Sequence, residues 1–218
     1  MEDLYPKGTT GTSTLRLYAS AAPVGRSAAT RYVANEGKPA RIELAKGPAP
    51  GGVFDAWTGL ALAPGRYRLL LALEDSLTGR IGRADAEIDV PAFPSQGLAL
   101  STVVLASDLS DAEGRLGVTA RSSGTFLKSE SLGVYYEVYG LPEADAHFTA
   151  SYRFFREMPD GSWTPVAKPI VLPDRSDAAQ GWSIPLAKWP AGRYRMEVTV
   201  MGADGASASG QTSFEVAE

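Results

Sequence analysis

The chain has 218 residues, of which 44% are hydrophobic and 21% are charged, and its formal net charge is −4. This balance is sufficient for hydrophobic cores, argues against intrinsic disorder, and gives no sign of a surface that tracks nucleic-acid phosphates. Because the sequence contains no cysteine, it excludes disulfides, thiolate metal sites and cysteine nucleophiles.

Glycine and proline divide the chain into short runs. The 23 glycines and 15 prolines cluster between β-rich segments, a pattern typical of an all-β protein. No apolar run approaches the ~20 residues that span a membrane. Residues 1–12 are polar and expected to be loosely ordered, and the first six lack the basic and apolar segments of a signal peptide. The protein is therefore either cytoplasmic or a piece of a longer chain, and we expect the second, because a short acidic segment leads directly into a strand.

The first part of the chain predicts several strands in succession. Residues 14–20 and 41–44 alternate apolar and polar side chains, as half-buried strands do, and residues 53–62 form a further expected strand. Residues 66–73 then place leucines on one face and arginines on the other, while residues 86–90 alternate with acids. These last two segments predict a hairpin whose arginines pair with carboxylates across the strands.

A linker is expected at residues 91–97, which contain Pro91 and Pro94. Beyond it the pattern predicts strands at residues 98–106, 132–139, 148–156, 169–172, 182–186, 193–201 and 207–216. An acidic loop is expected at residues 107–114. Helix signals are poor throughout.

Part of the sequence occurs twice. Gly65-Arg66-Tyr67-Arg68 recurs as residues 192–195, and Glu87 and Val90 correspond to Ser213 and Val216 with one residue lost from the register. A turn, a tyrosine-bearing strand, a polar loop and a closing strand used twice predict two tandem immunoglobulin- or fibronectin III-like β-sandwich domains, at residues 1–93 and 94–218.

Tyr67 and Tyr194 each follow a turn that contains proline and glycine. The spacing resembles the tyrosine corner of immunoglobulin-like sandwiches, in which the phenol hydroxyl bonds back to the backbone. We expect both tyrosines to be structural.

Aromatic residues gather on two expected strands, 132–139 and 148–156, interpreted as a hairpin. On each strand one face must enter the core, which leaves Tyr135, Tyr139, Arg153 and Phe155 as the candidate binding surface. This surface could be covered by protein, either the first domain or a neighbouring one, or could be a platform for a sugar.

Catalytic and metal-binding patterns are weak. His147 is the single histidine, and Glu143, Asp145 and His147 alternate as metal ligands on a strand would, but the run is better interpreted as an exposed loop. Residues 107–114 imitate the Asp-x-Ser-x-Ser ion site of von Willebrand factor A domains, yet Ala112 stands where the second serine should be. Since no Gly-x-Ser-x-Gly elbow or phosphate-binding loop is present, no cofactor, metal or catalytic residue is predicted.

Several strings resemble a bacterial family. Residues 62–68 (Leu-Ala-Pro-Gly-Arg-Tyr-Arg), 79–82, 88–91 and 98–102 are similar to the β-rich C-terminal regions of von Willebrand factor A-related proteins. Residues 132–141 resemble a strand of those proteins and of GWxTD-domain proteins. The A domain itself is absent. The resemblance implies exported accessory sandwiches and carries over no catalytic residue.

The sequence therefore predicts a non-enzymatic structural or protein-interaction module of a bacterial envelope or secreted protein, located outside the cytoplasm. Its expected partner is a protein, and no nucleic acid or membrane span is expected. The alternative is a carbohydrate-binding module that uses the exposed aromatics of the second domain.

Overall fold

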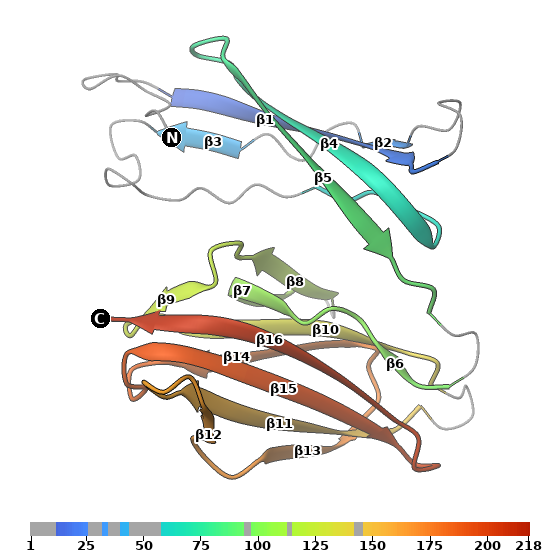
Figure 1. Cartoon of the computed structure of the whole chain (residues 1–218), viewed down its shortest axis with the longest axis vertical. Helices are drawn as coiled ribbons and strands as arrows, with labels where there is room; N and C mark the ends of the chain where they lie inside the picture. Colours follow the sequence, from blue (N-terminus) through green and yellow to red (C-terminus); the bar gives the residue numbers. More distant parts are fainter. Residues whose placement is uncertain are drawn as a thin grey trace. The chain divides into compact units, whose positions relative to one another are not determined.

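The computed structural model describes residues 12–25, 32–34, 40–43, 58–93, 97–112, 115–141 and 146–218 (Figure 1). Every regular element in these ranges is a β-strand, which confirms the all-β class. None of these residues belongs to a helix long and apolar enough to cross a membrane. The chain divides into two compact units, Met1–Ala92 and Phe93–Glu218. That the chain consists of two separate domains, the first of which is also a sandwich, stays a prediction.

The first unit contains a five-stranded antiparallel sheet with the order β2-β1-β4-β5, in which β3 also pairs with β1. The strands predicted at residues 14–20 and 41–44 are confirmed where the structure describes them. Residues 58–62 lie outside any strand, so that part of the predicted strand 53–62 is wrong, and residues 53–57 lie outside the described residues. The bounds are β1 Thr12–Pro23, β2 Tyr32–Ala34, β3 Ala40–Glu43, β4 Gly65–Asp75 and β5 Ile81–Val90.

Strands β4 and β5 form the predicted hairpin. Arg66 pairs with Glu87 at 2.7 Å and Arg68 pairs with Asp85 at 3.0 Å, so the expected arginine–carboxylate ladder is confirmed. All four side chains are more than half exposed, and each ion pair therefore adds little to stability. In the connecting turn the carboxylate of Asp75 accepts hydrogen bonds from the Leu77 amide and the Thr78 hydroxyl.

The second unit is a sandwich of two sheets. One has the order β14-β10-β7-β8 with β6 on β10, and the other has the order β12-β11-β15-β16-β9 with β13 on β11. The arrangement of β14-β10-β7 against β11-β15-β16 is that of an immunoglobulin-type sandwich. Their bounds are β6 Ala99–Leu100, β7 Val104–Ala112, β8 Arg115–Ala120, β9 Thr125–Leu127, β10 Ser131–Tyr139, β11 Phe148–Glu157, β12 Trp163–Pro165, β13 Ile170–Arg175, β14 Ala179–Pro185, β15 Gly192–Gly202 and β16 Ser207–Ala217.

The core of this unit lies between the two sheets. Alternate residues of β10, β11 and β15 are almost fully buried, as expected for strands with one face on a core. The Tyr136 and Tyr152 hydroxyls lie 2.7 Å apart and satisfy each other, because one donates to the other. The ring of Trp182 packs against Tyr152 with a centroid distance of 4.8 Å. The sandwich thus has a polar contact inside an aromatic core.

The sequence repeat is also a structural repeat. Gly65 and Gly192 have φ values of 151° and 149° at the first residue of β4 and β15, a region that favours glycine. Gly65 lies opposite Val90 on β5, and Gly192 lies opposite Val216 on β16. The corresponding residues that we aligned from sequence therefore occupy the same cross-strand positions in both units.

Two local expectations are wrong. Strands β10 and β11 do not form a hairpin: β10 pairs with β14, β6 and β7, while β11 belongs to the other sheet. The expected loop at 107–114 is strand up to Ala112, since β7 continues through it and pairs with β8. The ladder is irregular between Ala106 and Asp108. Residues 113 and 114 lie outside the described residues.

Candidate functional site

The four residues proposed as one binding surface lie on different sheets. Tyr135 and Tyr139 lie on the outer face of β10, because Tyr136 and Val138 between them point into the core. Arg153 and Phe155 lie on the outer face of β11, because they alternate with the core residues Tyr152 and Phe154. The prediction of a shared face is therefore wrong, and the structure contains two separate clusters.

The first cluster is built around Glu137. Its carboxylate accepts hydrogen bonds from the hydroxyls of Tyr135, at 2.5 Å, and Tyr139. All three side chains lie on one face because they are two residues apart on a strand. The ring of Phe93 packs on Tyr139 with centroids 4.4 Å apart. We call this cluster, made of Phe93, Tyr135, Glu137 and Tyr139, the tyrosine face.

The electrostatics of the tyrosine face follow from this geometry. Hydrogen bonds from Tyr135 and Tyr139 lower the pKa of Glu137, which is therefore an anion at neutral pH. Burial and the hydrogen bond to Glu137 raise the pKa of Tyr135 to about 12. The hydrogen bond to Glu137, assisted by partial burial, raises the pKa of Tyr139 to about 12. The face thus presents a fixed negative charge between two neutral phenols.

The strand beneath this face is held in place by backbone and hydroxyl groups. The amide of Glu137 donates to the Ser101 hydroxyl oxygen at 2.8 Å, and the Ser101 amide donates to the Glu137 carbonyl at 2.9 Å. Two glycines permit close packing nearby. A Cβ on Gly133 would lie 2.7 Å from the Ala106 carbonyl oxygen, and one on Gly181 would lie 2.6 Å from Leu116 Cδ2. The support of the tyrosine face is therefore tightly packed.

The second cluster is an arginine–aromatic stack on the opposite sheet. The Arg195 guanidinium lies 5.0 Å from the centroid of the Phe155 ring and 4.9 Å from that of Trp163, and Arg153 lies 5.6 Å from Phe155. Phe155 is only 9% exposed, because these side chains cover it. Sequence reasoning missed Trp163 and Arg195, although Arg195 belongs to the repeated Gly-Arg-Tyr-Arg string.

This stack is less suited to binding than the tyrosine face. Arg195 lies 3.4 Å from Glu197, and its Nε atom is buried without a hydrogen-bond acceptor. The Phe155 ring is already covered by cation–π contacts from Arg153 and Arg195, which are worth about 0.5–1 kcal/mol each where exposed. The contacts of Arg195 with Phe155 and Trp163 hold β12 against β11 and β15.

Tyr67 and Tyr194 have the geometry of tyrosine corners. The Tyr67 hydroxyl donates to the carbonyl oxygen of Ala63 at 2.9 Å, and the Tyr194 hydroxyl donates to that of Pro190 at 2.6 Å. Each acceptor lies four residues before its tyrosine, and both rings are buried. Their role is to fix the turn before the strand.

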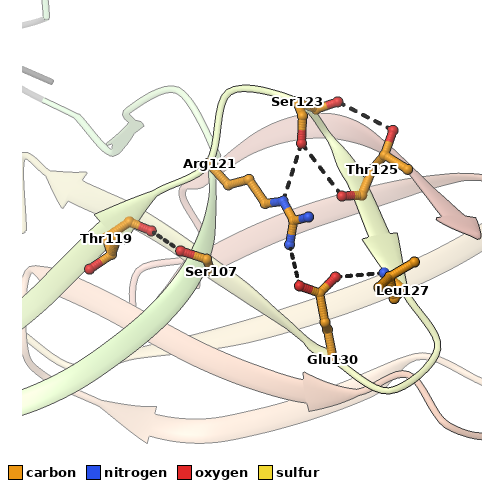
Figure 2. A network of polar contacts seen from close by, with 7 residues as sticks. All are labelled: Ser107, Thr119, Arg121, Ser123, Thr125, Leu127 and Glu130. Atoms are coloured by element: carbon orange, nitrogen blue, oxygen red, sulfur yellow. Dashed lines mark hydrogen bonds and ion pairs between the residues drawn. The ribbon is translucent and has the colours of Figure 1, made fainter. Parts of the chain in front are cut away.

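A polar network joins the connection around β9 to the start of β10 (Figure 2). Arg121 pairs with Glu130 at 2.9 Å and donates to the Ser123 hydroxyl at 3.2 Å, and Glu130 accepts the Leu127 amide at 2.6 Å. Burial acts to raise the pKa of Glu130, but the Leu127 amide and Arg121 outweigh it and lower that pKa. In the same view Ser107 donates to the Thr119 carbonyl at the β7 irregularity. This network is structural.

Among the described residues, His147 lies beside the carboxylate of Asp174. Its Nδ1 is 2.7 Å from the Asp174 carboxylate, and both side chains are more than half exposed. Glu143 and Asp145, the other two residues of the alternating run, lie outside the described residues. No group of three or more potential ligands is assembled in the portion of the chain that is described.

A shallow hollow of about 600 Å³ lies where β11 turns toward β12. It is lined by Arg156, Glu157, Met158, Pro159, Gly161 and Arg193. Arg156 donates to the Ala191 carbonyl and Arg193 pairs with Glu157, so each charged side chain at this hollow already has a partner within the protein. His147 is not among the lining residues.

No protein-family model matches the sequence, and no curated protein matches it. Solved structures with a similar fold include the soluble domain of PmoD from Methylocystis sp., with 13% identity and a TM-score of 0.33 over 58% of this chain and 95% of that one. An immunoglobulin-like protein from Pseudomonas aeruginosa has 14% identity and a TM-score of 0.33 over 56% of this chain and 98% of that one. A bacterial ice-binding adhesin has 11% identity and a TM-score of 0.26 over 95% of this chain and 54% of that one. At these TM-scores the likenesses carry no argument about fold or function.

Proposed function

We propose that the chain is a non-enzymatic structural and protein-interaction module, and that the tyrosine face is its interaction surface. The observation that carries the proposal is the carboxylate of Glu137, held between two half-buried tyrosines on the outside of a sheet. Aromatic rings beside a fixed negative charge favour a cationic side chain, through cation–π and charge attraction. The expected partner is therefore a protein segment with an exposed lysine or arginine.

The proposed setting is a bacterial envelope or secreted protein outside the cytoplasm. It is supported by the resemblance to the C-terminal sandwiches of von Willebrand factor A-related and GWxTD-domain proteins. In such a setting the sandwich is a spacer and a contact point, because tyrosine corners and the Arg121 network stabilise it without creating a reactive group.

A carbohydrate-binding module is the second candidate. Tyr135 and Tyr139 are aromatic, partly exposed and next to a carboxylate that could accept hydrogen bonds from sugar hydroxyls. Sugar platforms use exposed rings that lie flat together, whereas Phe93 and Tyr139 are tilted by 39°. The geometry thus favours a protein partner over a glycan.

The test is selection from a displayed library of random peptides with the intact chain as the target. Peptides that bind the parent chain are then compared on Glu137→Gln and Tyr139→Ala. Tyr18→Ala is the matched control, because Tyr18 is also a surface tyrosine, 39% exposed, and donates to Glu74 at 2.9 Å.

The proposal predicts peptides rich in lysine or arginine that lose binding with both variants of the tyrosine face and keep it with Tyr18→Ala. A glycan array probed with the same four proteins tests the second candidate, the carbohydrate-binding module. Glycan binding that depends on Tyr139 but not on the charge of Glu137 would establish the second candidate instead. Peptides that bind all four proteins equally would refute both.

A further inference from the structure

Within the described part of the first unit, strand β5 is the last strand of its sheet. Among the described strands it pairs only with β4, so the backbone groups on its other side have no strand partner. Residues 81–87 are all exposed, and Ile81 is 57% exposed. A long, exposed edge of this kind is a template for another strand unless its side chains prevent pairing.

The charges on β5 fall into two groups. Asp85 and Glu87 are already neutralised by Arg68 and Arg66 on β4. Arg83 and Asp89 have no ion-pair partner among the described residues, even though Asp89 lies opposite Arg66 in the ladder, because Arg66 pairs with Glu87 instead. Two opposite charges are therefore available, each three residues from Ala86.

This spacing makes the strand complementary to itself. When two copies of β5 pair antiparallel about Ala86, Arg83 of each copy lies opposite Asp89 of the other, and both free charges are used twice. Asp85 then lies opposite Glu87 of the second copy, but each carries its own arginine from β4, so the row is neutral overall. If the antiparallel pairing were centred on Asp85 instead of Ala86, the two copies of Asp85 would lie opposite each other. Asp89 of each copy would then lie opposite Ile81 of the other.

The other face of β5 is complementary in size. Five residues of β5 share the face of Tyr67, Leu69, Leu71 and Leu73 on β4, as the β4–β5 register shows: Gly82, Ala84, Ala86, Ile88 and Val90. In the Ala86 register Gly82 lies opposite Val90, and Ala84 lies opposite Ile88, so a small residue faces a large one on both sides of the central Ala86–Ala86 pair. Cross-strand pairs of this kind are the unit of sheet stabilisation.

We propose that β5 is a self-pairing edge that joins two copies of this chain about a two-fold axis into one continuous sheet. The partner is a second copy because both the charge pattern and the size pattern of β5 are satisfied by the same strand reversed. This surface lies in the first unit and does not depend on the tyrosine face.

The test uses sedimentation of the full chain from micromolar to millimolar concentration. The proposal predicts a reversible change from 23.0 kDa toward twice that mass. In the dimer of Arg83→Glu, the introduced glutamate of each copy would lie opposite Asp89 of the other copy, so two pairs of acids would repel each other. In the dimer of Asp89→Arg, the introduced arginine of each copy would lie opposite Arg83 of the other copy, so two pairs of arginines would repel each other. Each single variant should weaken the dimer by about tenfold or more.

Two combinations test the register itself. The double variant Arg83→Glu/Asp89→Arg restores both pairs with exchanged signs and should dimerise like the parent chain. An equal mixture of the two single variants should form a mixed dimer, although neither pairs well with itself. All substitutions are at exposed positions, and the mixture shows that each variant is folded.

A parent chain that stays at 23.0 kDa at millimolar concentration overturns the proposal. So does a dimer that survives both single variants unchanged, since it would form through another surface. Recovery in the mixture, combined with loss in each single variant, is the result that establishes antiparallel pairing about Ala86.

Discussion

The hydroxyl pair of Tyr136 and Tyr152 gives the sharpest test of how the second unit is built. The two atoms lie 2.7 Å apart in the core, and both side chains are 1% exposed. Replacing either tyrosine by phenylalanine leaves the other hydroxyl buried without this partner, which costs about 1–3 kcal/mol. Replacing both removes the two polar groups together, and the free energy of unfolding should then fall by less than the sum of the single changes.

We expect a coupling of at least about 1 kcal/mol between the two positions, because the second substitution removes the unsatisfied hydroxyl that the first one creates. Urea denaturation followed by tryptophan fluorescence measures it. Trp182 is a suitable reporter, since its ring packs against Tyr152. Tyr18→Phe, at an exposed site, should change the midpoint little. Single effects that simply add would show that Tyr136 and Tyr152 do not meet across the sandwich.

Three further predictions concern stability. Tyr67→Phe and Tyr194→Phe should each lower the free energy of unfolding by about 1 kcal/mol, measured by urea denaturation, and neither should alter peptide binding at the tyrosine face. Gly133→Ala should cost about 1–3 kcal/mol in the same assay, because its Cβ would meet the Ala106 carbonyl at 2.7 Å, whereas Gly59→Ala has open space and should be nearly neutral. Folding raises the pKa of Tyr135 and Tyr139 from 10.0 to about 12. The stability that the two protonated phenols contribute is therefore complete below pH 10 and is lost as the pH rises toward 12. Urea midpoints measured against pH should show this loss of stability, and the loss should be smaller in Glu137→Gln.

The parts of the fold that sequence predicts well are those fixed by local chemistry. Gly65 and Gly192 need a positive φ, and the tyrosine two residues later reaches back to a carbonyl, so the repeat identifies both turns and their strands. The ladder of Arg66 and Arg68 with Glu87 and Asp85 follows from alternation alone. Such features depend on a few neighbouring residues, which is why they can be read without a structure.

The candidate site was harder to predict because it depends on which sheet each strand joins. Tyr135 and Phe155 alternate with core residues in the same way whether β10 and β11 pair or face each other, so periodicity cannot separate the two arrangements. Residues 107–112 look like a loop because this part of the β7–β8 hairpin is largely exposed and carries no apolar alternation. Arg195 and Trp163 are far apart in sequence and meet only because β15 and β12 both pair with β11.

The central claim is that binding occurs at the tyrosine face and not at a surface shared with the arginine–aromatic stack. Its most direct test is the affinity of the selected peptides for two double variants, Tyr135→Ala/Tyr139→Ala and Arg153→Ala/Phe155→Leu. The account predicts that the first abolishes binding and that the second leaves it unchanged. Equal losses in both variants, with both still folded, would contradict it.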